Sequence, residues 1–162
     1  MEKRKWYVIQ SKPQKERLVC AQLRSAPIEV DVFFPRLRNH TGVRPLFPSY
    51  LFVNMAMNNV ANYKFIKYTR GVLRLVGTRE GPIPVLPDVV ETIQSRMGPH
   101  DMLDQRYVMP MGRAVRVRKG PLKDLIGILE KPVSEEGRVQ ILFRLLRYPL
   151  RAVLKFEELE VI

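Results

Sequence analysis

The sequence contains few of the residues from which metal sites and nucleophilic centres are built. Of its 162 residues, one is cysteine and two are histidine. The single Cys20 excludes an intrachain disulfide and a cysteine-built zinc site, and a buried apolar role fits its place in a helical pattern. His40 and His100 have neither metal-ligand nor triad-like spacing, and no phosphate-binding glycine motif is present. We therefore expect no catalytic residues, no metal and no cofactor.

Long apolar runs are also missing. No stretch approaches the roughly 18 apolar residues that cross a bilayer. The first apolar segment, Trp6 to Ile9, is too short for a signal peptide. We expect a soluble, cytoplasmic monomer that does not bind membranes.

Acidic residues are scarce relative to basic ones. The chain has 16 Asp and Glu against 28 Lys and Arg, a formal net charge of +12, and most of the excess lies in residues 1–98. A one-sided basic surplus indicates a polyanionic partner, and nucleic acid is the commonest. The alternative is a charged surface that serves only solubility.

The first 98 residues alternate between segments typical of strands and segments typical of helices. β-Branched and aromatic residues favour strands, whereas spaced apolar residues among charged ones, after Pro13 or Pro87, favour helices. The order βαββαβ predicts an α+β, ferredoxin-like domain over residues 1–98. The predicted elements are a strand at 6–9, a helix at 14–25, strands at 30–38 and 46–55 around a turn at Gly42, a helix at 60–68, a strand at 71–76 and a helix from residue 87.

Residues 99–162 differ from the first 98 in their pattern of apolar residues, prolines and glycines. Residues 99–111 contain two prolines and no sustained period, which predicts a linker. Residues 112–162 contain short alternating runs separated by glycines, a spacing typical of a small β-barrel.

Part of this second domain also fits helices. Residues 138–146 alternate as a strand does, yet the same segment places Leu142, Leu145 and Leu146 on one helical face. Gly127 and Pro149 oppose helices, at costs of about 1 and about 3 kcal/mol respectively. We expect the barrel as the resting state, with a helical hairpin in a closed state as the alternative.

Several segments, taken in order, resemble the NusG family of transcription elongation factors. Residues 45–53, P-L-F-P-S-Y-L-F-V, resemble a strand of that family's N-terminal domain, and residues 69–72, T-R-G-V, resemble one of its turns. Residues 6–9 with the charged stretch at 15–17 resemble the start of the same domain. The glycine-containing segment 112–127 resembles a KOW motif. The resemblance therefore spans the chain and implies a KOW β-barrel over residues 112–162.

The resemblance implies a non-enzymatic elongation or antitermination factor. Such a factor binds the clamp of RNA polymerase and the exposed non-template DNA strand, and so suppresses pausing or termination. Its KOW domain would recruit a ribosomal protein or a termination factor. The alternative function is that of a KOW-containing RNA-binding or ribosome-associated protein.

The resemblance also implies which residues contact the polymerase. Phe47, Tyr50 and Phe52 match the apolar patch that binds the clamp, and strand alternation sends Tyr50 and Phe52 to the same face. Aromatic side chains are frequent interface anchors. The alternative is that these residues only fill the core of their own domain.

A nucleic-acid-binding face is implied at the start of the first helix and at the T-R-G turn. Its basic residues neutralise phosphates, and its glutamines can hydrogen-bond to base edges. The alternative is solvated surface charge. The predicted residues are Lys12, Gln14, Lys15, Gln22, Thr69 and Arg70.

Within the family, the compact length and high charge resemble the specialised paralogue RfaH. RfaH switches its second domain between a helical hairpin, which masks the clamp-binding patch, and a KOW barrel. Arg44 is a departure from RfaH, which has at this place an acidic residue that pairs with the second domain.

Overall fold

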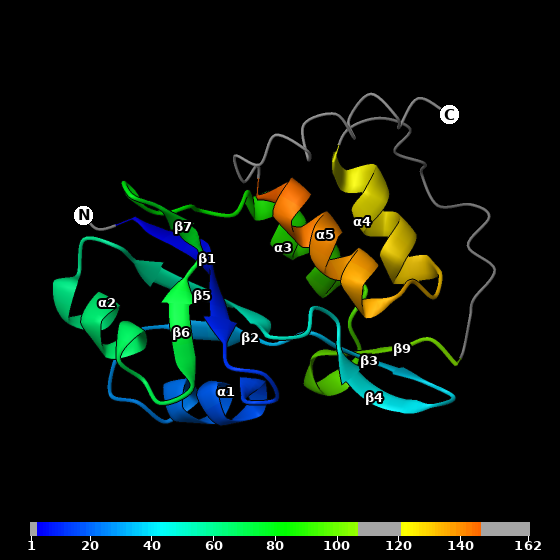
Figure 1. The fold of residues 1–162 in the computed structure, drawn as a ribbon, viewed down its shortest axis with the longest axis horizontal. Helices are drawn as coiled ribbons and strands as arrows, with labels where there is room; N and C mark the ends of the chain where they lie inside the picture. The colour runs from blue at the N-terminus through cyan, green and yellow to red at the C-terminus, as the bar shows by residue number, and fades with distance from the viewer. Residues whose placement is uncertain (1–2, 107–120, 147–162) are drawn as a thin grey trace.

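The computed structural model describes residues 3–106 and 121–146, which form an α+β fold (Figure 1). The helices are α1 (Glu16–Arg24), α2 (Val60–Lys67), α3 (Pro87–Ser95), α4 (Pro121–Glu130) and α5 (Glu135–Leu145), with a short 3-10 helix at Pro99–Asp101. The strands are β1 (Arg4–Ser11), β2 (Asp31–Phe33), β3 (Arg36–Asn39), β4 (Gly42–Pro45), β5 (Tyr50–Ala56), β6 (Val72–Leu75), β7 (Gly77–Thr78), β8 (Gly81–Pro82) and β9 (Met102–Asp104).

The central sheet has four antiparallel strands in the order β2-β5-β1-β6. Helix α1 connects β1 to β2, and α2 connects β5 to β6, so each helix joins two strands that are separated by one other strand. This is the split βαβ arrangement, and it is consistent with the predicted order of elements in the first domain.

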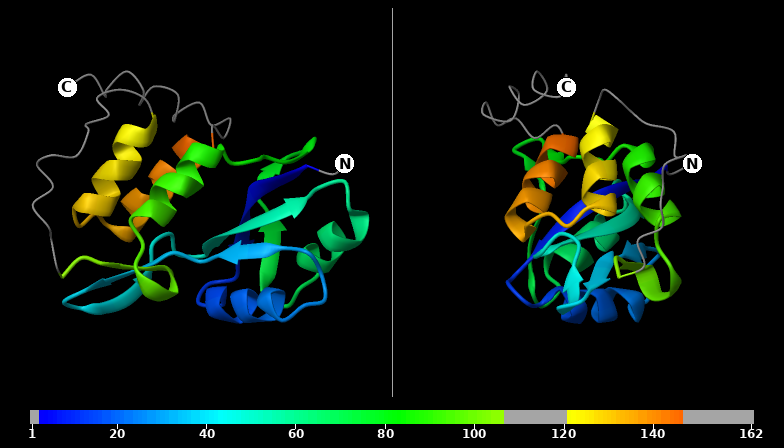
Figure 2. Two further views of the ribbon diagram at one scale, coloured as in Figure 1. Left: turned by 180° about the vertical axis from the view of Figure 1, so that it is seen from behind. Right: turned by 90° about the vertical axis from the view of Figure 1, so that its right-hand side faces the viewer.

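The two faces of the sheet support two separate cores. Along β5, Leu51, Val53 and Met55 face the core that contains residues of α1 and α2. Tyr50 and Phe52 face the other core, which contains residues of α3, α4 and α5. The predicted alternation along this strand is therefore confirmed. Figure 2 shows the three helices α3, α4 and α5 grouped together, away from α1 and α2.

Two predicted strands are shorter than expected. The strand expected at 30–38 is interrupted between β2 and β3 at Phe34 and Pro35, because proline has no N–H to donate to a neighbouring strand. The strand expected at 46–55 begins only at Tyr50, after a turn in which Ser49 has a φ of 74°. The Glu16 carboxylate accepts a hydrogen bond from the Ser49 backbone N–H at 2.7 Å and holds this turn against α1.

A second, smaller sheet extends from the first domain. Strands β3 and β4 form a hairpin, and β9 pairs parallel with β3 on its other side. The first part of the expected linker, residues 99–106, thus contains the 3-10 helix and β9, which lie against the N-terminal domain. The rest of that segment lies outside the described residues.

Residues 121–146 form a helical hairpin, which is the alternative that the sequence offers for this segment, so the expected KOW barrel is not confirmed. Residues 138–146, which also fit a strand, belong to α5 and its C-terminal cap Leu146, and the Ser134 side chain caps the start of this helix by accepting from the Gly137 N–H at 3.1 Å. Leu142, Leu145 and Leu146 are at most 3% exposed, on the helical face that the sequence had offered as the alternative. Residues 112–120 and 147–162 of the expected barrel, including Pro149, lie outside the described residues. Among the described helices, none is long and apolar enough to cross a membrane.

Candidate functional site

The three aromatic residues predicted to bind the polymerase lie together on one face of the central sheet. The ring centroids of Phe47 and Phe52 are 6.0 Å apart in an edge-to-face arrangement, and those of Phe33 and Phe52 are 5.8 Å apart. Phe47 and Phe52 are fully buried, and Tyr50 is 8% exposed. The sheet, together with the turn held by Glu16, therefore brings the predicted patch together.

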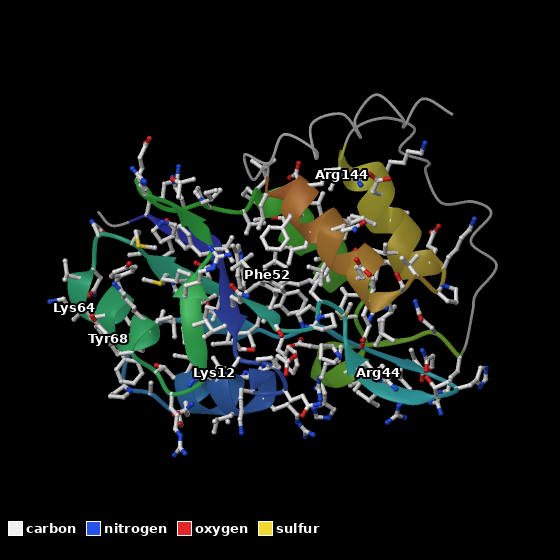
Figure 3. The ribbon with its side chains drawn as sticks, viewed as in Figure 1. Lys12, Arg44, Phe52, Lys64, Tyr68 and Arg144 are labelled. Carbon is white, nitrogen blue, oxygen red and sulfur yellow. The ribbon has the colours of Figure 1, made fainter. Side chains whose placement is uncertain are left out.

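The helical hairpin α4–α5 covers this aromatic patch (Figure 3). The ring of Phe143 in α5 meets that of Tyr50 edge-to-face, with centroids 5.3 Å apart. The hairpin also contributes fully or nearly fully buried aliphatic side chains to the same core: Leu125, Ile128, Leu129, Leu142, Leu145 and Leu146. The aromatic residues are thus buried as core residues are, and the hairpin α4–α5 supplies part of their cover.

A buried arginine joins the hairpin to the loop before β5. Arg138 of α5 is 5% exposed, and its guanidinium donates to the backbone carbonyls of Leu46 at 2.6 Å and Pro45 at 3.2 Å. A third donor bonds the Val133 carbonyl. Burial lowers the pKa of the Arg138 guanidinium from its ordinary value, and the nearby Glu135 carboxylate opposes that shift.

Arg138 was not predicted from the sequence. Its partners are backbone carbonyls, which every residue carries, so no complementary residue type marks the pairing. The only indication in the sequence was a charged residue next to the apolar face that residues 138–146 would have as a helix.

Ion pairs lie at the edges of the covered face. Arg96, the C-terminal cap of α3, pairs with Glu130 of α4 at 3.2 Å, with both side chains partly buried. Arg44 of β4 lies 4.0 Å from Glu135 of α5, with both side chains about half exposed. An exposed pair of this kind contributes little, about 1 kcal/mol or less. In this pair the arginine is on the first domain and the carboxylate is on the hairpin.

The predicted nucleic-acid face lies at the junction of the β1–α1 turn and the α2–β6 turn. The Lys12 N–H donates to the Gly71 carbonyl at 2.8 Å, and the Gln22 side-chain amide donates to the Arg70 carbonyl at 2.8 Å. Gly71 has a φ of 95°, and a Cβ there would lie 3.1 Å from a methyl group of Val19, so this close approach of the two turns requires glycine. The two predicted segments are therefore held side by side.

The six predicted residues differ in how they are placed. Lys12, Lys15 and Arg70 are exposed, whereas Thr69 and Gln22 are partly buried. The Thr69 hydroxyl donates to a carbonyl of α2, and the Gln22 amide is engaged as above, so both also hold the local structure. Gln14 is exposed, has a φ of 64°, and lines a pocket between the β1–α1 turn and the β3–β4 hairpin.

Features of an enzyme site are not seen in the part of the chain that the structure describes. Cys20 is 5% exposed, which confirms its predicted buried role, and burial raises the pKa of its thiol and so disfavours the reactive thiolate. No group of three or more His, Cys, Asp or Glu side chains that could hold a metal ion occurs among the described residues. The candidate site is therefore a pair of surfaces, one apolar and covered, the other basic and exposed.

Comparisons with known proteins find relatives of this chain in one family. The family model described as transcription termination factor nusG matches residues 4–94. The transcription termination/antitermination protein NusG of Escherichia coli K12 is 26% identical over 156 aligned positions, covering 86% of both chains. The protein of the same name from Haemophilus influenzae is 26% identical over 179 aligned positions, covering all of this chain and 96% of its own.

A solved structure also has a similar fold. It is described as domain interaction in Thermotoga maritima NusG, and it covers 75% of this chain and 76% of its own. The TM-score is 0.50 at 22% sequence identity.

Proposed function

The chain belongs to the NusG family of transcription termination and antitermination factors, and we propose that it binds RNA polymerase and the non-template DNA strand and suppresses pausing or termination. The observation that supports this most is that one domain carries both the covered aromatic patch and an exposed basic surface. We call this surface the basic junction; it consists of Lys12, Lys15 and Arg70 at the β1–α1 and α2–β6 turns. The chain acts by binding in this proposal and performs no chemical reaction.

The polymerase-binding surface is the sheet face around Phe47, Tyr50 and Phe52, and its partner is the polymerase clamp. A face made of large aromatic and aliphatic side chains is a suitable anchor for a helical partner, and α4–α5 already demonstrates that two helices fit on it. While the hairpin lies there, the clamp cannot use the same side chains. Binding to the polymerase therefore requires that the hairpin leave the sheet.

The covered patch supports an RfaH-like behaviour within the family. In this proposal the described arrangement is the closed state, and the released second domain refolds as a KOW barrel that recruits a ribosomal protein or a termination factor. The two periods found in residues 138–146 make both structures compatible with one sequence. Gly127 lies within α4 and costs a helix about 1 kcal/mol, so it makes the helical conformation of this segment easier to lose.

The DNA-binding surface is the basic junction, and a triple substitution tests it. Lys12→Ala, Lys15→Ala and Arg70→Ala together are expected to weaken binding to single-stranded DNA, because three phosphate contacts are lost. The slope of log K against log salt should become shallower by about 0.7 for each lost contact on a single strand, or about 2 in all. Fluorescence anisotropy of a labelled oligonucleotide over a salt titration measures this change.

Arg79→Ala is the control for lost charge, since Arg79 is exposed in the β7–β8 turn and is not one of the predicted residues. A wild-type salt slope in the triple variant would contradict the assignment. An RNA oligonucleotide of the same sequence is the second arm. Strong preference for RNA, together with no binding to RNA polymerase, would favour the alternative of an RNA-binding or ribosome-associated protein.

A further inference from the structure

A pocket of about 430 Å³ lies between the β1–α1 turn, the β3–β4 hairpin and the N-terminal end of α5. Its lining includes three arginines, Arg17, Arg36 and Arg44, and two carboxylates, Glu16 and Glu135. Pro13, Pro45 and Pro48 supply apolar wall. None of the three arginines was predicted to bind nucleic acid, and the pocket is separate from the covered sheet face.

The arginines of the pocket are placed to receive an anion. Arg36 is held in position, because its guanidinium donates to the His100 carbonyl at 2.6 Å and lies 5.6 Å from the centre of the Phe34 ring. Arg17 is exposed on α1, and among the described residues its side chain has no hydrogen bond or ion pair. Arg44 is exposed on β4, and within residues 3–106 and 121–146 its one ion pair is the long contact with Glu135.

One of the two carboxylates stays in the pocket when the hairpin leaves, and the other does not. Glu16 is 6% exposed and accepts the Ser49 N–H, so its charge belongs to the fold of the first domain. Glu135 comes from α5, and its carboxylate lies 4.0 Å from both Arg44 and Arg138. When the hairpin leaves the sheet, Glu135 and Arg138 leave with it, and Arg44 loses the one ion-pair partner that it has among the described residues.

We propose that this pocket is a second binding site for the phosphodiester backbone of nucleic acid, and that Glu135 weakens it while the hairpin is closed. The inference rests on the proposed function, since the ligand is the DNA strand that the basic junction binds. The pocket is continuous with that junction through the β1–α1 turn, where Gln14 lines the pocket between Lys12 and Lys15. In Figure 3, Lys12 and Arg44 both lie in the lower half of the view.

Release of the hairpin would then strengthen binding to two partners, RNA polymerase and nucleic acid. Removing α5 uncovers the apolar face for the polymerase, and it also removes the Glu135 carboxylate from the lining of a pocket that includes three arginines. Arg138 leaves with α5 as well, but it does not line the pocket. Arginine suits this role because its planar group forms paired hydrogen bonds with phosphate oxygens. The closed chain would thus bind nucleic acid more weakly than the released chain.

The test uses the full chain and a fluorescein-labelled 12-nucleotide single strand of mixed sequence. The double variant Arg17→Gln/Arg44→Gln should bind more weakly, with a salt slope shallower by about 1.4, that is about 0.7 for each lost contact. Glu135→Gln should bind more tightly than the wild type. Arg79→Gln, in the β7–β8 turn, is the matched control and should leave the slope unchanged.

A combination of variants separates the pocket from simple opening of the hairpin. If Glu135 acts through the pocket, the gain from Glu135→Gln disappears when Arg17 and Arg44 are also glutamine. A gain that persists in that triple variant would mean that Glu135→Gln only opens the hairpin, and would overturn the proposal. Wild-type binding by Arg17→Gln/Arg44→Gln would also overturn it, while the response of Lys12, Lys15 and Arg70 would still report on the proposed function separately.

Inorganic phosphate at matched ionic strength distinguishes the source of the phosphate group. It should leave DNA binding unchanged, because one free anion does not replace a chain of linked phosphates. If it reduces DNA binding by the wild type to the level of the Arg17→Gln/Arg44→Gln variant, the pocket is a site for free phosphate, and the assignment to nucleic acid is wrong.

Discussion

Replacing Leu142 with aspartate is expected to release α4–α5 from the sheet and to raise the affinity for RNA polymerase about thirtyfold. Leu142 is fully buried in the core that the hairpin shares with the sheet. A carboxylate there would have to be buried without a partner, at a cost of several kcal/mol. If the closed state is favoured by about 2 kcal/mol, about one chain in thirty is open, and complete release lowers the apparent Kd by that factor.

The matched control is Gln140→Asp, which places the same charge on the exposed side of α5. It should leave the polymerase affinity close to that of the wild type. Pull-down titration of core RNA polymerase measures both variants, and far-UV circular dichroism reports whether helix is lost on release. Equal affinity of the wild type and Leu142→Asp, with helix lost in the variant, would show that the hairpin does not mask the polymerase site.

Tyr50→Ala in the released background, Leu142→Asp, should weaken polymerase binding by at least about 2 kcal/mol, or about thirtyfold, as expected for loss of a buried aromatic anchor. The released background is needed because Tyr50 also contacts Phe143. In the wild type, Tyr50→Ala would destabilise the closed state and the polymerase complex together, and the two effects would partly cancel. Tyr50 is also a better choice than Phe47, which is fully buried and whose truncation would cost the first domain about 3–5 kcal/mol.

Tyr68→Ala in the same background is the control for loss of a tyrosine. Tyr68 is 75% exposed at the end of α2, and Figure 3 shows it far from α4 and α5. Fluorescence of Trp6, the only tryptophan, checks that the first domain remains folded, because this ring packs against the same core. Unchanged polymerase binding by a folded Tyr50→Ala variant would remove Tyr50 from the interface.

The first domain could be predicted in some detail because local pattern and tertiary contacts agree there. The apolar alternation of β5 corresponds to two cores on opposite faces of the sheet, so periodicity alone identified which of Tyr50, Leu51 and Phe52 share a side. The basic junction could be predicted only by resemblance. The Gln22–Arg70 hydrogen bond joins α1 to the α2–β6 turn across 48 residues of sequence, and composition does not reveal such a contact.

Periodicity could not predict the structure of the second domain, because residues 138–146 fit both the two-residue period of a strand and the 3.6-residue period of a helix. The choice of helix in residues 135–145 follows from contacts with distant residues, namely the ring of Tyr50 and the carbonyls of Pro45 and Leu46. None of these contacts is encoded within the helix itself. When the hairpin leaves the sheet for solvent, α5 loses these contacts, and the segment can then adopt the strand conformation instead of the helix.

Hydrogen exchange with and without core RNA polymerase tests most directly the claim that the hairpin and the polymerase use the same face. On adding the polymerase, amides of residues 121–146 should lose the protection pattern of the helices α4 and α5 as the hairpin leaves the sheet, while amides of residues 46–56 should remain protected by the new partner. If the polymerase binds and residues 121–146 keep the same residue-by-residue protection as in the free chain, the polymerase contacts some other surface, and the account of the covered face is contradicted.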